Sequence, residues 1–136
     1  MRFFDTNILI YAVSRQDERK RVIAQDLLVH AMEVNGDGCI TLQVLCEFVN
    51  TLRKKRLLPA ERIRELVSGF SELLRSEVTY DMVMQADLIA EEYGLQFYDA
   101  QIIAAAEKLG CHEIVSEDLN AGQIYRGMVV VNPFVQ

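Results

Sequence analysis

The residues that build disulfides and zinc sites are scarce in this sequence. Its 136 residues include three cysteines, two histidines, two prolines and no tryptophan. The cysteines are odd in number and stand in apolar stretches, which favours buried free thiols in a reducing compartment over disulfides. A structural zinc site needs four close ligands, and Cys111-His112 is the only place where a Cys and a His are adjacent. We therefore expect neither a disulfide framework nor structural zinc.

Long apolar runs and export signals are also missing. No apolar run approaches the roughly 20 residues that a membrane-spanning helix requires. The first residues lack the charged region, long apolar stretch and small-residue cleavage site of a signal peptide. Half of the residues (51%) are hydrophobic and 25% are charged, as is typical of a globular chain. We expect one complete domain over residues 1–136, with no membrane contact and a cytoplasmic location.

Positive charge is scarce in the second half of the chain. Residues 1–64 contain 11 Lys and Arg against 8 Asp and Glu, whereas residues 65–136 contain 3 against 12. An acidic surface repels phosphates, so RNA binding would depend on the basic first half and on bound divalent cations. Two basic clusters, within residues 15–21 and 53–56, suit either contacts with phosphates or solvated cations. Cations are also favoured at the C-terminal end of a helix, where the second cluster stands.

Strand and helix patterns alternate along the chain. Short apolar segments predict strands at residues 3–4, 39–41, 78–79, 113–116 and 128–131. Apolar positions three and four apart, with suitable caps, predict helices at residues 8–13, 17–33, 42–57, 59–74, 81–93 and 98–109. Strands that are apolar throughout and alternate with helices indicate a parallel sheet covered on both faces. The fold class is therefore α/β, and ligands of such sheets bind outside the carboxyl ends of the strands.

Four acidic residues stand where a site in such a fold would form. Asp5 follows the first strand, and Asp118 comes shortly after the strand at 113–116. Asp99 begins a helix, and Glu47 is the only charge in an apolar helical stretch. Each acid has an ordinary alternative, because Asp5 and Asp99 also suit helix caps. Glu47 also suits the edge of a buried helix face, and Asp118 also suits a turn.

The combination of these acids points to a hard cation. Thr6 and Asn7 either cap the helix or orient the Asp5 carboxylate, and Glu117 is expected to be solvated. Carboxylates without a useful histidine or cysteine suit Mg²⁺ or Mn²⁺. Such an ion lowers the pKa of a bound water and stabilises the reacting oxygens of a phosphodiester. The residues by themselves indicate a carboxylate metal site and no particular substrate.

The motifs that contain these acids resemble those of a known family. The chain is similar to a PIN domain, and in particular to the toxin nucleases of bacterial and archaeal VapBC toxin–antitoxin pairs. The resemblance covers essentially all of the chain. The matching stretches are Asp5-Thr6-Asn7-Ile8-Leu9, Leu45-Cys46-Glu47-Phe48, Tyr98-Asp99-Ala100 and Ser116-Glu117-Asp118.

The resemblance implies a three-layer α/β/α sandwich around a mostly parallel sheet of about five strands. It implies that Asp5, Glu47, Asp99 and Asp118 are the catalytic metal ligands, with Thr6, Asn7 and Ser116 in support. Family members cut RNA with metal-activated water, which leaves a 3′-hydroxyl and a 5′-phosphate. They commonly form homodimers and are inhibited by a small cognate antitoxin that covers the site. Asn120 stands where some members carry a further acid, so we expect one tightly bound ion, with a second arriving only with substrate.

Other functions remain open on the sequence. A catalytically silent PIN-like module that binds RNA or protein has no support from the sequence, since all four acids are present, and is not excluded by it. A receiver-type Mg-binding signalling domain would have paired acids after the first strand and a lysine near the end, but the last lysine here is Lys108. A phosphatase with an aspartyl nucleophile would have a second acid at position 7, which is Asn. A metal-free ribonuclease needs paired histidines, and His30 and His112 are poor candidates.

Overall fold

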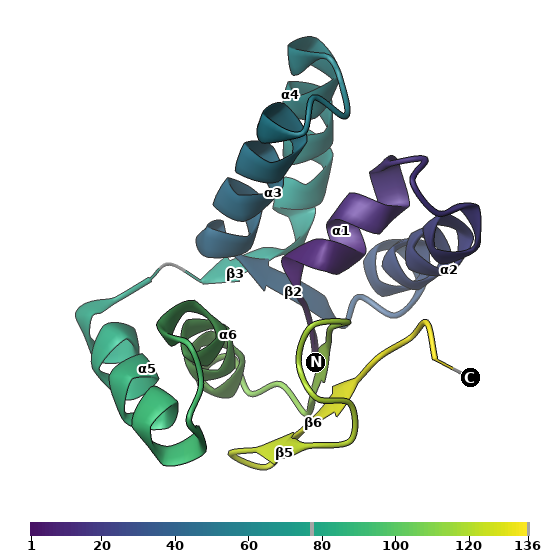
Figure 1. The fold of residues 1–136 in the computed structure, drawn as a ribbon. Helices are drawn as coiled ribbons and strands as arrows, with labels where there is room; N and C mark the ends of the chain where they lie inside the picture. Colours follow the sequence, from purple (N-terminus) through teal and green to yellow (C-terminus); the bar gives the residue numbers. More distant parts are fainter. Residues whose placement is uncertain (77, 136) are drawn as a thin grey trace.

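The computed structural model describes residues 1–76 and 78–135 (Figure 1). Within them a six-stranded sheet has the strand order β3-β2-β1-β4-β6-β5. The strands are β1 (Arg2–Phe4), β2 (Gly38–Thr41), β3 (Leu74–Ser76), β4 (Glu113–Val115), β5 (Ile124–Tyr125) and β6 (Met128–Val131). The helices are α1 (Thr6–Val13), α2 (Glu18–Val29), α3 (Leu42–Lys54), α4 (Ala60–Phe70), α5 (Tyr80–Tyr93) and α6 (Phe97–Lys108), with short turns η1 (His30–Val34) and η2 (Ser71–Leu73).

The six helices flank the sheet, which confirms the predicted α/β/α sandwich. In Figure 1, α3 and α4 lie side by side, α5 packs against α6, and α1 packs against both α2 and α3. Every pair of neighbouring strands is parallel except β5 and β6, which are antiparallel. No helix in the described part of the chain is both long and apolar enough to cross a membrane.

The strand order creates a crevice at the carboxyl ends of β1 and β4. From β1 the chain passes to β2 and β3 on one side, then crosses to β4 and β6 on the other side. The carboxyl ends of β1 and β4 therefore flank a topological switch point, where α/β sheets bind their ligands. Asp5 follows β1 and Ser116 follows β4, and the Asp5 N–H donates to the Val115 carbonyl (3.0 Å). Two of the predicted motifs are thus brought to one crevice by the topology alone.

The core is built from aromatic and aliphatic side chains of the sheet and the helices that cover it. Phe3 and Phe4 of β1 are fully buried, and each such side chain contributes about 1.5–3 kcal/mol. Phe48 of α3 meets Phe70 of α4 edge to face, with ring centroids 5.4 Å apart. Gly38 begins β2 because a Cβ there would lie only 2.8 Å from the Phe4 ring. This packing fixes β1, and so the position of Asp5, within the sheet.

The predicted strand at residues 78–79 is wrong. The third strand is β3, which pairs with β2 immediately after the turn η2. Val78 and Thr79 are exposed, and the Thr79 hydroxyl accepts a hydrogen bond from the Met82 N–H (3.3 Å) at the start of α5. β-Branched residues such as these two are typical of strands, but Thr79 caps the following helix instead.

The prediction of about five strands missed the two-residue strand β5. It pairs with β6 through a tight hairpin in which Arg126 and Gly127 have φ angles of 50° and 84°. Two successive positive φ angles are typical of a type I′ turn, for which Asn-Gly is the usual sequence signal. Arg126 is an uncommon residue in the first of these positions, which explains why the hairpin was not predicted from the sequence.

The helix ends differ from the predictions by a few residues, for local reasons. α1 begins at Thr6 because Asp5 caps it, and α2 gives way to the π-helical turn η1 after Val29. α3 stops at Lys54 because Arg56 adopts a positive φ of 51°, which no right-handed helix tolerates. α4 ends at Phe70, so that Leu73 and Leu74 belong to η2 and β3.

The cysteines only partly match the prediction of buried free thiols. Cys39 and Cys111 are buried and free, and their sulfurs lie 3.3 Å apart. Cys46 is also free but exposed, because it lies on the outer side of α3, so its prediction as buried is wrong. The apolar neighbours of Cys46 in the sequence belong to the opposite face of the helix, which is a consequence of the 3.6-residue period.

Candidate active site

Asp5 is a buried carboxylate held by three hydrogen-bond donors. Its side chain is 5% exposed, and it caps α1 by accepting a hydrogen bond from the Thr6 N–H (2.7 Å). Its other oxygen accepts from the Ser116 hydroxyl (2.7 Å) and from the Asn7 side-chain amide (3.4 Å). Both sequence interpretations of Asp5 are therefore compatible, since one oxygen caps the helix and the other is oriented by Ser116 and Asn7.

Ser116 joins the two strand ends. Its side chain is fully buried, and its hydroxyl donates to Asp5 Oδ2. The Ser116 hydroxyl oxygen also accepts hydrogen bonds from the backbone N–H groups of Asp118 (3.1 Å) and Leu119 (3.3 Å). This one hydroxyl therefore sets both the Asp5 carboxylate and the turn that carries Asp118.

The Asp5 carboxylate is electrostatically unfavourable as it stands. The pKa of Asp5 is raised from its ordinary 3.8 to about 6, mainly by burial and to a smaller extent by the charges of Asp118 and Glu47, against the lowering effect of the hydrogen bonds from Ser116 and Thr6. A carboxyl group whose pKa is raised by burial and by like charges is a typical mark of a functional site. The buried acid at the end of β1 is thus a candidate site residue as well as a helix cap.

Asn7 links Asp5 to Asp118. Its side-chain amide donates to Asp118 Oδ2 (3.1 Å) as well as toward Asp5, and its oxygen accepts from the Glu117 N–H (3.2 Å). Asp118 itself is exposed at the mouth of the crevice. Asn7 therefore holds the segment after β4 against the start of α1, across 111 residues of sequence.

Glu47 reaches the same crevice from α3. The Thr6 hydroxyl donates to Glu47 Oε2 (3.0 Å), and the Gln43 amide donates to Glu47 Oε1 (2.9 Å). Gln43 also donates to the Tyr98 carbonyl (3.3 Å), beside Asp99. Sequence reasoning did not select Gln43, although its place four residues before Glu47 on one helix face could have indicated it.

Asp99 lies in the first turn of α6, near enough to Asp118 and Glu47 for their charges to act on it. Burial raises the pKa of Asp99, and the negative charges of Asp118 and Glu47 add to the increase. No hydrogen bond to the Asp99 side chain is present among residues 1–76 and 78–135. Its electrostatic coupling to Asp118 and Glu47 places all four predicted acids in one neighbourhood, drawn from β1, α3, α6 and the end of β4.

The four acids lack compensating positive charge. None of them forms an ion pair with any Lys, Arg or His in the described ranges. As the side chains stand, no group of three or more His, Cys, Asp or Glu residues in those ranges is arranged so that it could hold a metal ion. Glu47 and Asp5 instead turn their oxygens to protein donors. The donor set suits Mg²⁺ or Mn²⁺ chemically, but the carboxylates are not gathered in advance around one point.

A cleft of about 300 Å³ opens beside the acids. Acidic, polar, apolar and basic side chains of α1, α3 and the loops form its walls. They are Thr6, Asn7, Ile10, Tyr11, Gln16, Glu47, Thr51, Lys55, Glu117 and Asp118. Asp5 and Asp99 do not line this hollow. The cleft therefore leads away from the acids along α3, toward Lys55.

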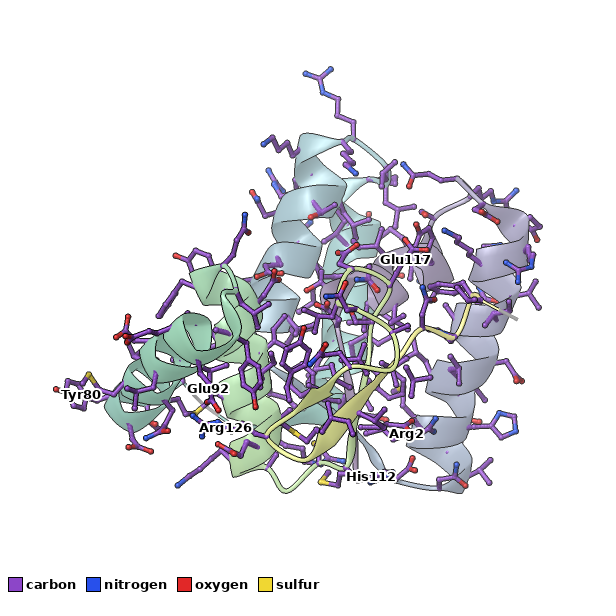
Figure 2. All side chains as sticks on the ribbon, turned by 60° about the horizontal axis from the view of Figure 1, so that its bottom comes forward. Arg2, Tyr80, Glu92, His112, Glu117 and Arg126 are labelled. Atoms are coloured by element: carbon purple, nitrogen blue, oxygen red, sulfur yellow. The ribbon has the colours of Figure 1, made fainter. Side chains whose placement is uncertain are left out.

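The expectation that Glu117 is solvated is wrong. The Tyr11 hydroxyl donates to Glu117 Oε1 (2.6 Å), and Lys20 forms an ion pair with the other oxygen. The hydrogen bond to Glu117 raises the pKa of the Tyr11 hydroxyl. In Figure 2, Glu117 lies above Arg2 and His112. Glu117 is therefore held by side chains of α1 and α2 instead of being free in solvent.

The PIN family model matches residues 2–127 of the chain, which contain all of the site residues. The chain therefore belongs to the PIN domain family. No functionally curated protein matches its sequence.

Solved structures with the same fold come from toxin–antitoxin systems. A toxin–antitoxin complex from Klebsiella pneumoniae is 21% identical with a TM-score of 0.71, over 98% of each chain. Mycobacterium tuberculosis VapC20, described as a toxin that cleaves the Sarcin-Ricin loop, is 22% identical with a TM-score of 0.65, over 87% of this chain and 92% of that one. VapBC2 from Rickettsia felis, bound to a DNA fragment from its promoter, is 15% identical with a TM-score of 0.65, over 95% and 96%. At these identities the likeness establishes the fold.

Proposed function

We propose that this chain is a metal-dependent endoribonuclease that acts in the cytoplasm as the toxin of a toxin–antitoxin pair. The observation that carries the proposal is the meeting of four carboxylates from distant segments, without a compensating cation in the described ranges, at the switch point of a PIN fold. Like charges that repel one another in a partly buried crevice are unfavourable unless a cation joins them. The toxin–antitoxin neighbours support the biological role.

The proposed ligands of a Mg²⁺ or Mn²⁺ ion are Asp5, Glu47, Asp99 and Asp118. When bound, such an ion lowers the pKa of a water molecule and stabilises the negative charge that develops at the phosphodiester. To serve as ligands, Glu47 and Asp118 would exchange hydrogen bonds from Thr6 and Asn7 for the cation. Ser116 would keep Asp5 in place throughout, because its hydroxyl is fully buried and donates to the carboxylate.

Two protein partners belong to the proposal. The neighbours from Klebsiella and Rickettsia are complexes of a toxin with its antitoxin, which supports a small inhibitory partner for this chain. A homodimer is supported by exposed apolar side chains spaced three and four apart along α5, namely Tyr80, Val83, Met84 and Leu88. Tyr80, which is 81% exposed, projects at the periphery of the molecule in Figure 2.

Cleavage of RNA in the presence and absence of metal tests the enzyme assignment. We expect purified protein to cut a structured RNA pool in Mg²⁺ or Mn²⁺, to stop in EDTA, and to leave 5′-phosphate ends that sequencing of the products can detect. Asp99→Asn should abolish cutting. Asp81→Asn, a matched change in the first turn of α5, should not. Equal cutting in EDTA, or equal cutting by Asp99→Asn, would contradict the metal mechanism.

Expression in cells tests the biological role separately. We expect induction to arrest growth, Asp99→Asn to relieve the arrest, and co-expression of a small neighbouring gene to restore growth. Harmless expression of a protein that cuts RNA in vitro would remove the toxin role and leave the nuclease.

A further inference from the structure

The two basic clusters predicted from the sequence have different surroundings. In the first cluster, Lys20 is paired with Glu117 and Arg21 with Glu18. Arg19 donates to the Phe134 carbonyl (2.7 Å). Arg15 lines a separate hollow between α1, α2 and α4. The charges of this cluster are thus either matched by protein groups or directed away from the four acids.

The second cluster stands at the end of α3, and its cations point to different sides. Arg53 and Arg56 line a hollow together with residues of α4. Lys55 instead lines the acidic cleft and is exposed there. It is the only Lys or Arg among the described residues that line this cleft, and it forms no ion pair with any residue of the described ranges.

The helical period accounts for the position of Lys55. Glu47, Thr51 and Lys55 are four residues apart, so they follow one face of α3 and its C-terminal turn, and all three line the cleft. Eight residues of helix rise about 12 Å. A nucleic-acid strand whose reacting phosphate lay at the acids would therefore carry another phosphate past Lys55, a few nucleotides along.

We propose that Lys55 is a phosphate-binding site for the RNA strand, which fixes the path of the substrate along α3 away from the four acids. The inference rests on the proposed nuclease function and adds the direction in which the strand runs. An ammonium group on a flexible stem suits one phosphate as a point charge, without reading the base. An acidic cleft needs such a cation to hold a polyanion, because Glu47, Glu117 and Asp118 repel it.

Salt-dependent RNA binding tests the proposal independently of cleavage. The probe is a fluorescein-labelled, 12-nucleotide single-stranded RNA of mixed sequence. Its binding is measured by fluorescence polarisation to Asp99→Asn protein, alone and combined with Lys55→Gln, Lys55→Arg, Arg53→Gln or Arg56→Gln. Arg53→Gln and Arg56→Gln are matched controls, since they remove the same charge from the same end of α3.

Among the changes added to Asp99→Asn, we expect only Lys55→Gln to raise the Kd for RNA, by several-fold. It should lower the slope of log Kd against log salt by about 0.7, the value for loss of one phosphate contact by a single strand. Lys55→Arg should restore both values. The proposal would be overturned if Lys55→Gln, Arg53→Gln and Arg56→Gln gave the same slope of log Kd against log salt, or if Lys55→Gln left the Kd unchanged. Either result would overturn it even if the wild type cuts RNA. Absence of metal-dependent cutting by the wild type would instead contradict the proposed function.

Discussion

The two ends of the central sheet differ in whether their charged side chains are paired with opposite charges. At the amino ends of the strands, Arg2 is paired with Asp37 (3.3 Å) and lies 3.9 Å from Glu113. The terminal amine of Met1 lies 3.1 Å from the His112 ring. At the carboxyl ends, the charges of Asp5, Glu47, Asp99 and Asp118 repel one another, and none of these acids forms an ion pair with any residue of the described ranges.

Under the proposed function, this difference separates charge that serves folding from charge that serves metal binding. The amino end balances its charges and so contributes a little stability, as partly exposed ion pairs do. The carboxyl end accumulates like charges, and burial of Asp5 adds to the unfavourable energy. Proteins retain such destabilising arrangements where activity requires them.

Asp5→Asn should have the largest effect, and it should act in opposite directions on activity and stability. Loss of the ligand should lower the cleavage rate about 1,000-fold, equivalent to about 4 kcal/mol of lost stabilisation of the transition state. The unfolding free energy of the metal-free variant should rise, because the amide carries no charge and its oxygen still accepts from Ser116, and loss of the hydrogen bond from the Thr6 N–H offsets only part of this gain. Rate measurements and urea titration check the two effects. A variant that loses activity and stability together would contradict the contrast between the two ends.

Stability without metal should depend on pH through Asp5. Its pKa is about 6 in the folded protein and 3.8 ordinarily, so the folded state holds this proton more tightly. The stabilising contribution of Asp5 is present below pH 3.8 and is lost as the pH rises through about 6, by up to about 3 kcal/mol. Urea titrations in EDTA between pH 4 and pH 8 measure this loss. Asp5→Asn should lack it, and an identical pH profile of the two proteins would show that Asp5 titrates normally.

Ser116→Ala should lower the cleavage rate by about 10- to 100-fold, as expected for a residue that positions a metal ligand. The variant leaves Asp5 without one donor and releases the turn that carries Asp118. Ser116→Thr keeps the hydroxyl and should retain most of the activity. The dependence of rate on Mn²⁺ concentration distinguishes positioning from simple loss of fold, since Ser116→Ala should need more metal and recover part of its rate at saturation.

Asp37→Asn should have the smallest effect, because it removes an ion pair at the opposite end of the sheet. Asp37 is partly exposed and is paired with Arg2, so we expect a loss of less than about 1 kcal/mol of unfolding free energy. Cleavage by the folded variant should not change. Reduced activity with intact fold would mean that the two ends of the sheet are coupled.

The sequence was informative where a local pattern determines the structure. The apolar strand before Asp5 and the segment before Ser116 placed both residues at carboxyl ends, and the topology then brought them together. The partners of the acids were harder to predict, because they depend on contacts between distant elements. Gln43 touches the Tyr98 carbonyl 55 residues away, and Glu117 turns toward Lys20, 97 residues away. No pattern within one helix or strand contains such pairs.

The same limit applied to the basic cluster of α3. The sequence contains four consecutive cations at the end of a predicted helix. The favourable interaction between a cation and the C-terminal end of a helix applies to all four of them. The four-residue spacing from Glu47 through Thr51 to Lys55 separates Lys55 from Arg53 and Arg56, but it indicates a binding role only once the structure shows that this face of α3 lines the acidic cleft. The short strand β5 was not predicted for a related reason, since its pairing with β6 depends on an Arg126-Gly127 turn with unusual φ angles.

Direct titration with Mn²⁺, followed by the electron paramagnetic resonance signal of the free ion, tests the central claim most directly. The account predicts saturable binding of about one ion per chain in the wild type, weaker at pH 5 than at pH 8, because protons compete for Asp5. Asp5→Asn and Asp99→Asn should each abolish this binding, whereas Asp37→Asn should leave it unchanged. Mn²⁺ that stays free in millimolar wild-type protein at pH 8, or that binds equally well to Asp5→Asn, would contradict the claim that these carboxylates form a metal site.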